Sequence, residues 1–302
     1  MVTVATQADA PYSAISLITL RDAFGTPLIV APGYESLKLI PMYGGQGDLL
    51  ASADPANRPS FSSVSAGAAG TGNFTFISEL PLEFSKAYGV ISGANASLLP
   101  TLQMVMAASS AVYSTAPTTV PTMALDLDND FYWLPDGVAV EPPGLGSTCQ
   151  WVLAQGNPTI GSASTTRVAL PRLGGYLSTI ILIMRDSTGA RIDQYPTRVR
   201  IYVDGVPLID GRFDELVDDM YNWSGGLTRP TGVLAISRKT SMAQISLGLL
   251  DTGESFLSTN PGTLIEIEGA PWGTISNAPA TLSCLVGQIV PAGSLIQGLP
   301  EL

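Results

Sequence analysis

The sequence contains no histidine, and this absence removes several kinds of chemistry at once. Ser-His-Asp and Cys-His catalytic groups need an imidazole as general base, and many zinc sites use histidine ligands. The two cysteines, Cys149 and Cys284, are too few for a tetrathiolate zinc site. They could pair, but we expect two buried free thiols, because unpaired cysteine behaves as a small hydrophobic residue.

Charge is also scarce. Charged residues make up 13% of the chain, against about 25% in an ordinary soluble domain. The formal net charge is −11, and only three lysines are present, Lys38, Lys86 and Lys239. This balance disfavours a nucleic-acid partner, since phosphate binding needs clustered basic residues. The low charge and the 45% of hydrophobic residues argue against disorder and suggest that other copies of the chain cover much of the surface.

Long hydrophobic runs are missing as well. No stretch reaches the roughly 18–20 apolar residues that a membrane-spanning helix needs. The N-terminal sequence MVTVATQADAPYSA lacks the basic flank and apolar core of a secretion signal. We therefore expect the chain to be made as a soluble intracellular protein.

The clearest pattern in the chain lies within residues 178–205. Residues 198–203, RVRIYV, alternate between polar and apolar side chains, which indicates a half-buried strand. Residues 179–184, TIILIM, are almost wholly apolar, which suits a strand buried on both faces. Residues 186–189, DSTG, have the composition of a turn.

Similar short apolar runs separated by turn residues recur along the chain, and they predict an all-β sandwich or barrel. One segment, residues 212–221, has helical spacing, with Asp210 as its expected cap and Gly225-Gly226 at its end. We expect a loop at residues 51–73, in which residues 61–64 could form short strand pieces. We expect further strands at residues 14–20, 27–31, 36–43, 73–77, 80–84, 98–107, 112–114, 122–127, 131–134, 150–153, 166–170, 206–209, 232–237, 242–250, 263–268 and 281–290.

A length of 302 residues favours two domains. The Pro/Gly cluster EPPGLG lies near the midpoint and is the best linker candidate. We predict an N-terminal arm at residues 1–12, a first domain at 13–140, a linker at 141–147 and a second domain at 148–302.

One acidic run, DLDND at residues 126–130, imitates the opening of a calcium loop. The calcium loop of EF-hands needs glycine at its sixth position and glutamate at its twelfth, where this chain has Phe131 and Gly137. A strand would place Leu125 and Leu127 inward and the aspartates outward. We expect this solvated strand face rather than a cation site.

Four acidic residues on the exposed side of the expected helix could bind a divalent ion or act as paired carboxylates, but we expect them to be solvated: Asp214, Glu215, Asp218 and Asp219. The tryptophans and tyrosines are too dispersed to predict a sugar-binding platform. We expect Trp133 and Trp272, both at strand–turn boundaries, to be buried. The sequence thus indicates no catalytic residue, no cofactor-binding residue and no metal ligand.

Two passages carry a more specific likeness. The first, at residues 79–135, is ELPLEFSKAYGVISGANASLLPTLQMVMAASSAVYSTAPTTVPTMALDLDNDFYWLP. The second begins LPRLGGYLSTIILIMRDSTGARIDQYPTRVRIYVDGVPLIDGRFDELVDDMYNWSGG and continues in GTLIEIEGAPWGTISNAPATLSCLVGQIVPAG. In strand order and spacing, a Leu-Pro strand entry and an interrupting helix, residues 75–293 resemble the double jelly-roll major capsid proteins of tailless icosahedral double-stranded DNA viruses, tectivirus-like phages in particular. The first 70 residues match least.

This resemblance implies an all-β fold of two eight-stranded jelly-roll barrels side by side, with a short helix in the second. It implies a homotrimer that forms a pseudo-hexagonal capsomer, then a capsid lattice with penton and minor capsid proteins as neighbours. The N-terminal arm could contact an internal viral membrane. The expected location is the virion, after synthesis in the host cytoplasm, and the expected role is structural, without catalysis, cofactors or direct contact with nucleic acid.

Two other classes of function remain open at the level of sequence. A carbohydrate- or receptor-binding β-sandwich, such as a phage spike or lectin, would need clustered exposed aromatic residues or a calcium site. An enzyme on a jelly-roll scaffold would have to use carboxylates alone, as a glycoside hydrolase does.

Overall fold

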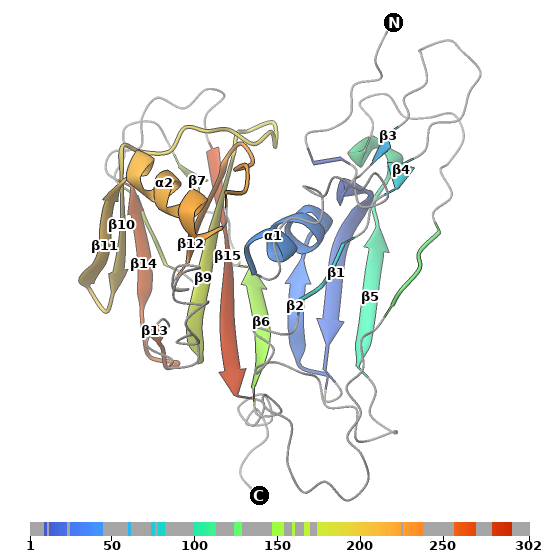
Figure 1. Ribbon diagram of the computed structural model, residues 1–302, viewed down its shortest axis with the longest axis horizontal. Helices are drawn as coiled ribbons and strands as arrows, with labels where there is room; N and C mark the ends of the chain where they lie inside the picture. The colour runs from blue at the N-terminus through green and yellow to red at the C-terminus, as the bar shows by residue number, and fades with distance from the viewer. Residues whose placement is uncertain are drawn as a thin grey trace, which may run out of the picture.

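The computed structural model describes residues 9–10, 12–22, 25–44, 60–61, 74–75, 78–81, 100–112, 124–128, 147–153, 159–160, 166–169, 174–224, 226–237, 257–269 and 280–291. Most of these residues lie in strands, which form a nine-stranded, a four-stranded and a two-stranded sheet (Figure 1).

The large sheet runs through both halves of the chain in the order β12 (Val233–Ser237), β9 (Tyr176–Arg185), β15 (Ala280–Pro291), β6 (Ser147–Leu153), β2 (Pro27–Ala31), β1 (Ile15–Arg21) and β5 (Thr101–Met106). Two short strands join it, β13 (Leu257–Ser258) beside β9 and β7 (Thr159–Ile160) beside β15. The four-stranded sheet has the order β11 (Val206–Arg212), β10 (Arg198–Val203), β14 (Ile265–Gly269) and β8 (Thr166–Ala169). The two-stranded sheet pairs β3 (Ser60–Phe61) with β4 (Phe74–Thr75).

The second half of the chain is a sandwich of two sheets. Strands β6, β15, β9 and β12 face strands β8, β14, β10 and β11, and the chain passes back and forth between the two layers as a jelly roll requires. One hydrophobic cluster fills the space between them and includes Leu182 of β9, Val199 and Ile201 of β10, Ile267 of β14 and Cys284 of β15. This arrangement confirms the half-buried strand expected at residues 198–203.

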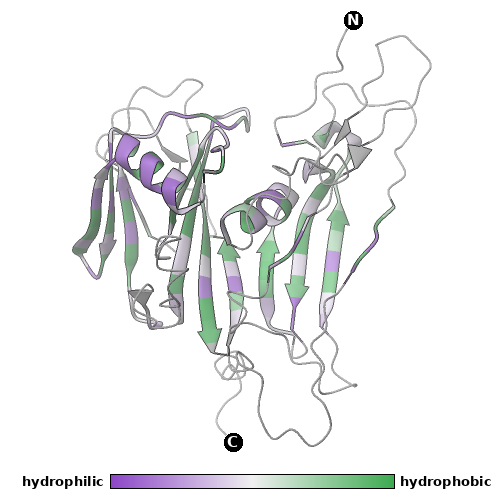
Figure 2. Ribbon diagram, viewed as in Figure 1, coloured by the Kyte–Doolittle hydropathy of each residue, from purple (hydrophilic) through white to green (hydrophobic). Residues whose placement is uncertain are grey.

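Strand β9 is buried on both faces, as its apolar sequence predicts. Ile180, Leu182 and Met184 pack in the cluster between the two sheets. Ile181 and Ile183 belong to a second cluster on the opposite face of the large sheet, which joins the two halves of the chain. Figure 2 shows this hydrophobic colouring along β9 and β15, in contrast to the hydrophilic outer helix α2 (Phe213–Trp223).

The strand expected at residues 36–43 is wrong, because this segment forms a π-helical turn, Glu35–Leu39, followed by α1 (Ile40–Gly44). The Ile40 N–H donates to the Glu35 carbonyl, and Pro41 has no N–H to donate further along the helix. The Ser78 hydroxyl donates instead to the Leu37 carbonyl at 2.6 Å. Nearly every residue of this segment is buried, so no polar face remained from which to recognise a helical period.

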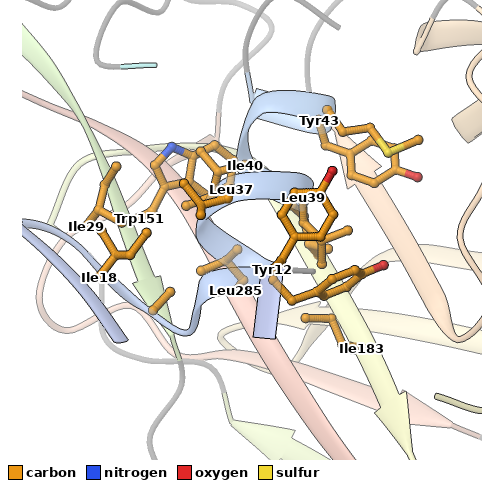
Figure 3. Packing of buried hydrophobic residues seen from close by; sticks show 14 of the residues in the cluster. Tyr12, Ile18, Ile29, Leu37, Leu39, Ile40, Tyr43, Trp151, Ile183 and Leu285 are labelled. Atoms are coloured by element: carbon orange, nitrogen blue, oxygen red, sulfur yellow. The ribbon is translucent and has the colours of Figure 1, made fainter. Parts of the chain in front are cut away.

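Trp151 fixes this helical segment on the large sheet (Figure 3). A Cβ added at Gly44, the end of α1, would lie 2.1 Å from the Trp151 ring, and one added at Gly287 of β15 would lie 2.7 Å from it. Both positions therefore need glycine for the indole to fit between helix and sheet. Because Trp151 opens the second half and α1 belongs to the first, this contact joins the two halves.

The helix expected at residues 212–221 is confirmed as α2, but its expected cap is not. Asp210 lies in β11, and its carboxylate accepts hydrogen bonds from Arg198 and Arg200. At the start of α2, Glu215 accepts the Arg212 N–H at 3.1 Å instead. Gly226 follows the helix with φ +85° and donates its N–H to the Tyr221 carbonyl, as a glycine after a helix commonly does.

The strands expected at residues 14–20, 27–31 and 98–107 are confirmed as β1, β2 and β5. The strand expected at residues 122–127 is wrong over residues 124–127, which have no strand structure. Several predictions fall outside the described residues: the strands at 131–134 and 242–250, the burial of Trp133 and Trp272, and all of the linker except Ser147, which begins β6. The domain limits at 13–140 and 148–302 stay predictions. Among the described helices, none has the length and apolarity to span a bilayer.

Candidate functional site

The four acidic residues on α2 do not form a binding site. Asp214 forms an ion pair with Arg212 at 3.6 Å, and Glu215 accepts the Arg212 N–H. Asp218 and Asp219 are exposed to solvent. Across the described ranges, no three histidine, cysteine, aspartate or glutamate residues lie close enough to hold a metal ion.

The calcium-like run is placed only in part, because residues 129–130 lie outside the described ranges. Leu125 and Leu127 are 60% and 55% exposed, so the inward orientation expected for them is wrong. Without strand pairing at residues 124–128, alternation along the sequence does not decide which side chains are buried.

The aromatic residues and cysteines that the structure describes serve mainly in packing. Trp151 is buried, and Trp223 packs edge-on against Tyr43 with ring centroids 5.9 Å apart. Cys149 and Cys284 are buried and form no disulfide with each other, which confirms the expectation of two buried thiols. Burial raises the pKa of the Cys284 thiol far above its ordinary value, so this thiol stays protonated and unreactive.

A network of charges covers the outward face of the four-stranded sheet, and we call it the outer ladder. Glu268 accepts from Arg167 at 2.6 Å and from Arg200 at 3.1 Å, and Asp210 accepts from Arg200 at 3.1 Å and from Arg198. The hydrogen bonds from these arginines lower the pKa values of Asp210 and Glu268. The ladder thus holds its carboxylates ionised. Asp210 and its two arginines are partly open to water, whereas the Glu268 side chain is only 8% exposed.

A second network lies at the junction of three distant segments, and we call it the buried cluster. Asp9 binds two arginines, Arg185 at 2.5 Å and Arg191 at 2.8 Å. Arg185 also donates to Glu35 at 3.1 Å. The Arg191 guanidinium lies over the Tyr34 ring, 4.5 Å from its centroid. Two positive and two negative charges therefore balance within largely buried surroundings.

Glu35 is the most buried carboxylate of this cluster, with its side chain 5% exposed. Burial raises its pKa above the ordinary value of 4.5, and the nearby Arg185 guanidinium offsets part of that rise. Among the described residues, its Oε2 atom has no hydrogen-bond partner. Glu35 thus takes up a proton at a higher pH than a water-exposed glutamate does.

Sequence reasoning missed all five residues of the buried cluster. The one local signal was that Arg185 and Arg191 bracket the predicted turn at 186–189. Nothing in the sequence connected Asp9 or Glu35 to that turn, because they lie 176 and 150 residues from Arg185.

An apolar surface remains open on the large sheet within the first half. Leu17 of β1 lies directly opposite Val105 of β5, and the two are 36% and 42% exposed. Val30 of the neighbouring strand β2 is 36% exposed. Exposed apolar side chains grouped on neighbouring strands are more often part of an interface than isolated ones.

No protein-family model matches the sequence, and no curated protein sequence matches it either. Solved structures do match its fold. The STIV MCP aligns over 99% of this chain and 85% of that chain, with TM-score 0.54 and 17% identity. A chain in the atomic structure of Sulfolobus Turreted Icosahedral Virus aligns over 99% of this chain and 81% of that chain, with TM-score 0.58 and 15% identity.

A third match is partial. The major capsid protein P2 from Bacteriophage PM2 aligns over 47% of this chain and 51% of that chain, with TM-score 0.33 and 16% identity. This chain thus spans about half the length of P2, and the fold assignment does not depend on that match. The two full-length matches and the alternating sheets of the second half confirm the expected fold class: the chain is a double jelly roll.

Proposed function

We propose that this chain is a major capsid protein that forms trimeric, pseudo-hexagonal capsomers of an icosahedral viral shell. The observation that carries the proposal is the match of 99% of the chain to the STIV MCP and to a chain of the Sulfolobus Turreted Icosahedral Virus structure. A match confined to one jelly roll would fit many binding modules, because single jelly rolls have many functions. A match across both halves fits a building block of a shell.

The surface of the chain supports self-association. The apolar side chains of Leu17, Val30 and Val105 lie on neighbouring strands, and exposed apolar side chains grouped in this way are typical of surfaces that other protein covers. The scarcity of lysine over the whole chain is also typical of surfaces that face other protein. The described charges on the four-stranded sheet are paired with one another, so that face suits a polar contact between capsomers.

The finer assignments belong to the same proposal. The partners are further copies of the chain, with penton and minor capsid proteins in the lattice, and an internal membrane within reach of the N-terminal arm. The location is the virion, after synthesis in the host cytoplasm. The role is structural and not enzymatic. A carbohydrate-binding sandwich is not favoured, because no described aromatic group forms an exposed platform.

The native mass of the purified protein tests this proposal. Multi-angle light scattering should give three times the 31.5 kDa chain mass, and electron microscopy should show pseudo-hexagonal particles or shells. The measurement should be repeated at low and high protein concentration, because a capsomer built for a shell should stay trimeric when diluted. A monomer at every micromolar concentration would contradict the proposal, and binding to a glycan array would then be the next measurement.

A further inference from the structure

The buried cluster contains two arginines that are positioned independently of the aspartate that binds between them. They bracket a tight turn, in which the Asp186 carboxylate accepts the Thr188 and Ala190 N–H groups at 2.9 and 3.0 Å. Gly189 has φ +85° and completes the turn. Arg185 and Arg191 then pair as a β-bridge, so their side chains leave the same short hairpin side by side.

Each guanidinium also has contacts that do not involve Asp9. Arg185 donates to Glu35 at 3.1 Å and to the Gly189 carbonyl at 3.3 Å. Arg191 donates to the Thr231 carbonyl at 2.9 Å and lies over the Tyr34 ring. These contacts fix the direction of both side chains before any carboxylate arrives, which lowers the entropy that binding must overcome.

The charges of this site favour a second anion. Among the described residues, Glu35 is the carboxylate besides Asp9 that contacts an arginine here, so without Asp9 the positive charge of the two guanidinium groups would be less compensated. Both arginine side chains are only 15–17% exposed, so water screens that charge poorly. The Asp9 carboxylate supplies the missing charge with one oxygen on each arginine.

We propose that Arg185, Arg191 and Tyr34 form a carboxylate-binding site, which the chain's own Asp9 occupies and which anchors the base of the N-terminal arm. Asp9 is suited to this role because its carbonyl also accepts the Ser13 N–H at 3.1 Å, which links the bound carboxylate to the short 3-10 helix Tyr12–Ala14. This site is independent of the proposed capsid role, since it rests on contacts within one chain.

Chemical rescue tests the proposal. Asp9→Ala removes the carboxylate, and formate is small enough to enter a site that is about 17% exposed at its rim. Hydrogen exchange at the Ser13 amide should become about tenfold faster in the variant, because its hydrogen bond to residue 9 is no longer anchored. Formate at about 100 mM should restore most of the urea midpoint that the variant loses, and chloride at equal ionic strength should not, because only a carboxylate can bridge both arginines in this geometry. Exchange at the Ser13 amide should stay fast, because free formate is not attached to residue 9.

Asp210→Ala is the matched control. Asp210 also lies between two arginines, Arg198 and Arg200, but those side chains are 48% and 32% exposed. Formate should not change the urea midpoint of this variant or of the wild type. Unchanged Ser13 exchange in folded Asp9→Ala, or equal effects of formate in all three proteins, would overturn the proposal.

Asp9→Asn covers the case in which Asp9→Ala does not fold, since the amide keeps the shape of the side chain and removes its charge. A variant that folds only when formate is present gives the same support as rescue of the urea midpoint. Failure of both variants to fold even with formate would overturn the proposal, because it would give Asp9 a role that a free carboxylate cannot replace.

Discussion

The buried cluster and the outer ladder are built from the same chemical groups, arginines and carboxylates at hydrogen-bonding distance, yet they act differently. In the cluster, Asp9 and Glu35 reach Arg185 across 176 and 150 residues of sequence. In the ladder, Asp210 reaches Arg198 and Arg200 across only 12 and 10 residues. The cluster therefore determines how distant segments pack, whereas these ladder contacts reinforce a strand pairing that backbone hydrogen bonds already define.

Water is the second difference. Charged side chains on an open sheet are hydrated whether or not they are paired, so their ion pairs contribute little to the free energy of unfolding. Charges inside the cluster have lost most of their hydration, so each depends on its partner to remain stable. The same pair of side chains therefore adds little to the stability of the fold at the surface but becomes indispensable once buried. Breaking a buried pair leaves a charge that neither its partner nor water stabilises.

The largest expected effect follows from removing the arginine that both cluster carboxylates share. Arg185→Met should lower the free energy of unfolding by about 3 kcal/mol, because it leaves Asp9 and Glu35 with less compensation in a buried site. Urea unfolding followed by tryptophan fluorescence measures this loss. Arg198→Met in the ladder is the control and should change the urea midpoint much less. Equal losses in the two variants would show that burial does not separate the two networks.

A smaller effect should appear as opposite pH dependences. The raised pKa of Glu35 means that the folded state binds a proton before the unfolded state does, so its contribution to stability grows as pH falls from 7 towards about 4.5 and is lost as pH rises. The lowered pKa values of Asp210 and Glu268 have the reverse sign, and their contribution disappears only below about pH 4.

Urea unfolding at several pH values between 7 and 5 should therefore show a gain in the wild type that Glu35→Gln abolishes. Glu268→Gln should leave that gain intact, because its carboxylate stays ionised throughout this range. An unchanged gain in Glu35→Gln would assign the pH dependence to another group.

The smallest expected effect concerns salt. Asp210→Asn should shift the urea midpoint slightly at low ionic strength and not at about 1 M salt, where screening acts over about 3 Å. Asp9→Asn should keep its effect at both salt concentrations, because the cluster excludes most of the solvent. If the effect of Asp210→Asn persisted in 1 M salt, the ladder would have to be regarded as effectively buried.

The sequence was most informative where a local pattern of residues determined the structure and no tertiary contact opposed it. The alternation RVRIYV predicted β10 correctly, and the apolar run TIILIM predicted a strand covered on both sides. The turn at 186–189 was evident from Asp186 and Gly189, and both act as turn residues in the structure. The regular succession of such short strands predicted an all-β sandwich or barrel, and the double jelly roll was expected only from the family resemblance.

Prediction failed where tertiary contacts outweighed the local pattern. Residues 36–43 are apolar on every side because they lie between the large sheet and other segments, so burial concealed their helical period. Asp210 is a residue type that commonly caps helices, but its carboxylate accepts hydrogen bonds from Arg198 and Arg200 across the sheet. The buried cluster was invisible for a related reason, since pairing of Asp9 with Arg185 depends on the completed fold.

The parallel pairing of β2 with β6, Ile29 opposite Trp151 and Val30 opposite Val152, has a mechanical consequence. It makes the nine-stranded sheet continuous from one half of the chain to the other. Separating β2 from β6 would therefore require breaking backbone hydrogen bonds as well as side-chain contacts. A load applied at the β5 edge has a path through paired strands as far as β12.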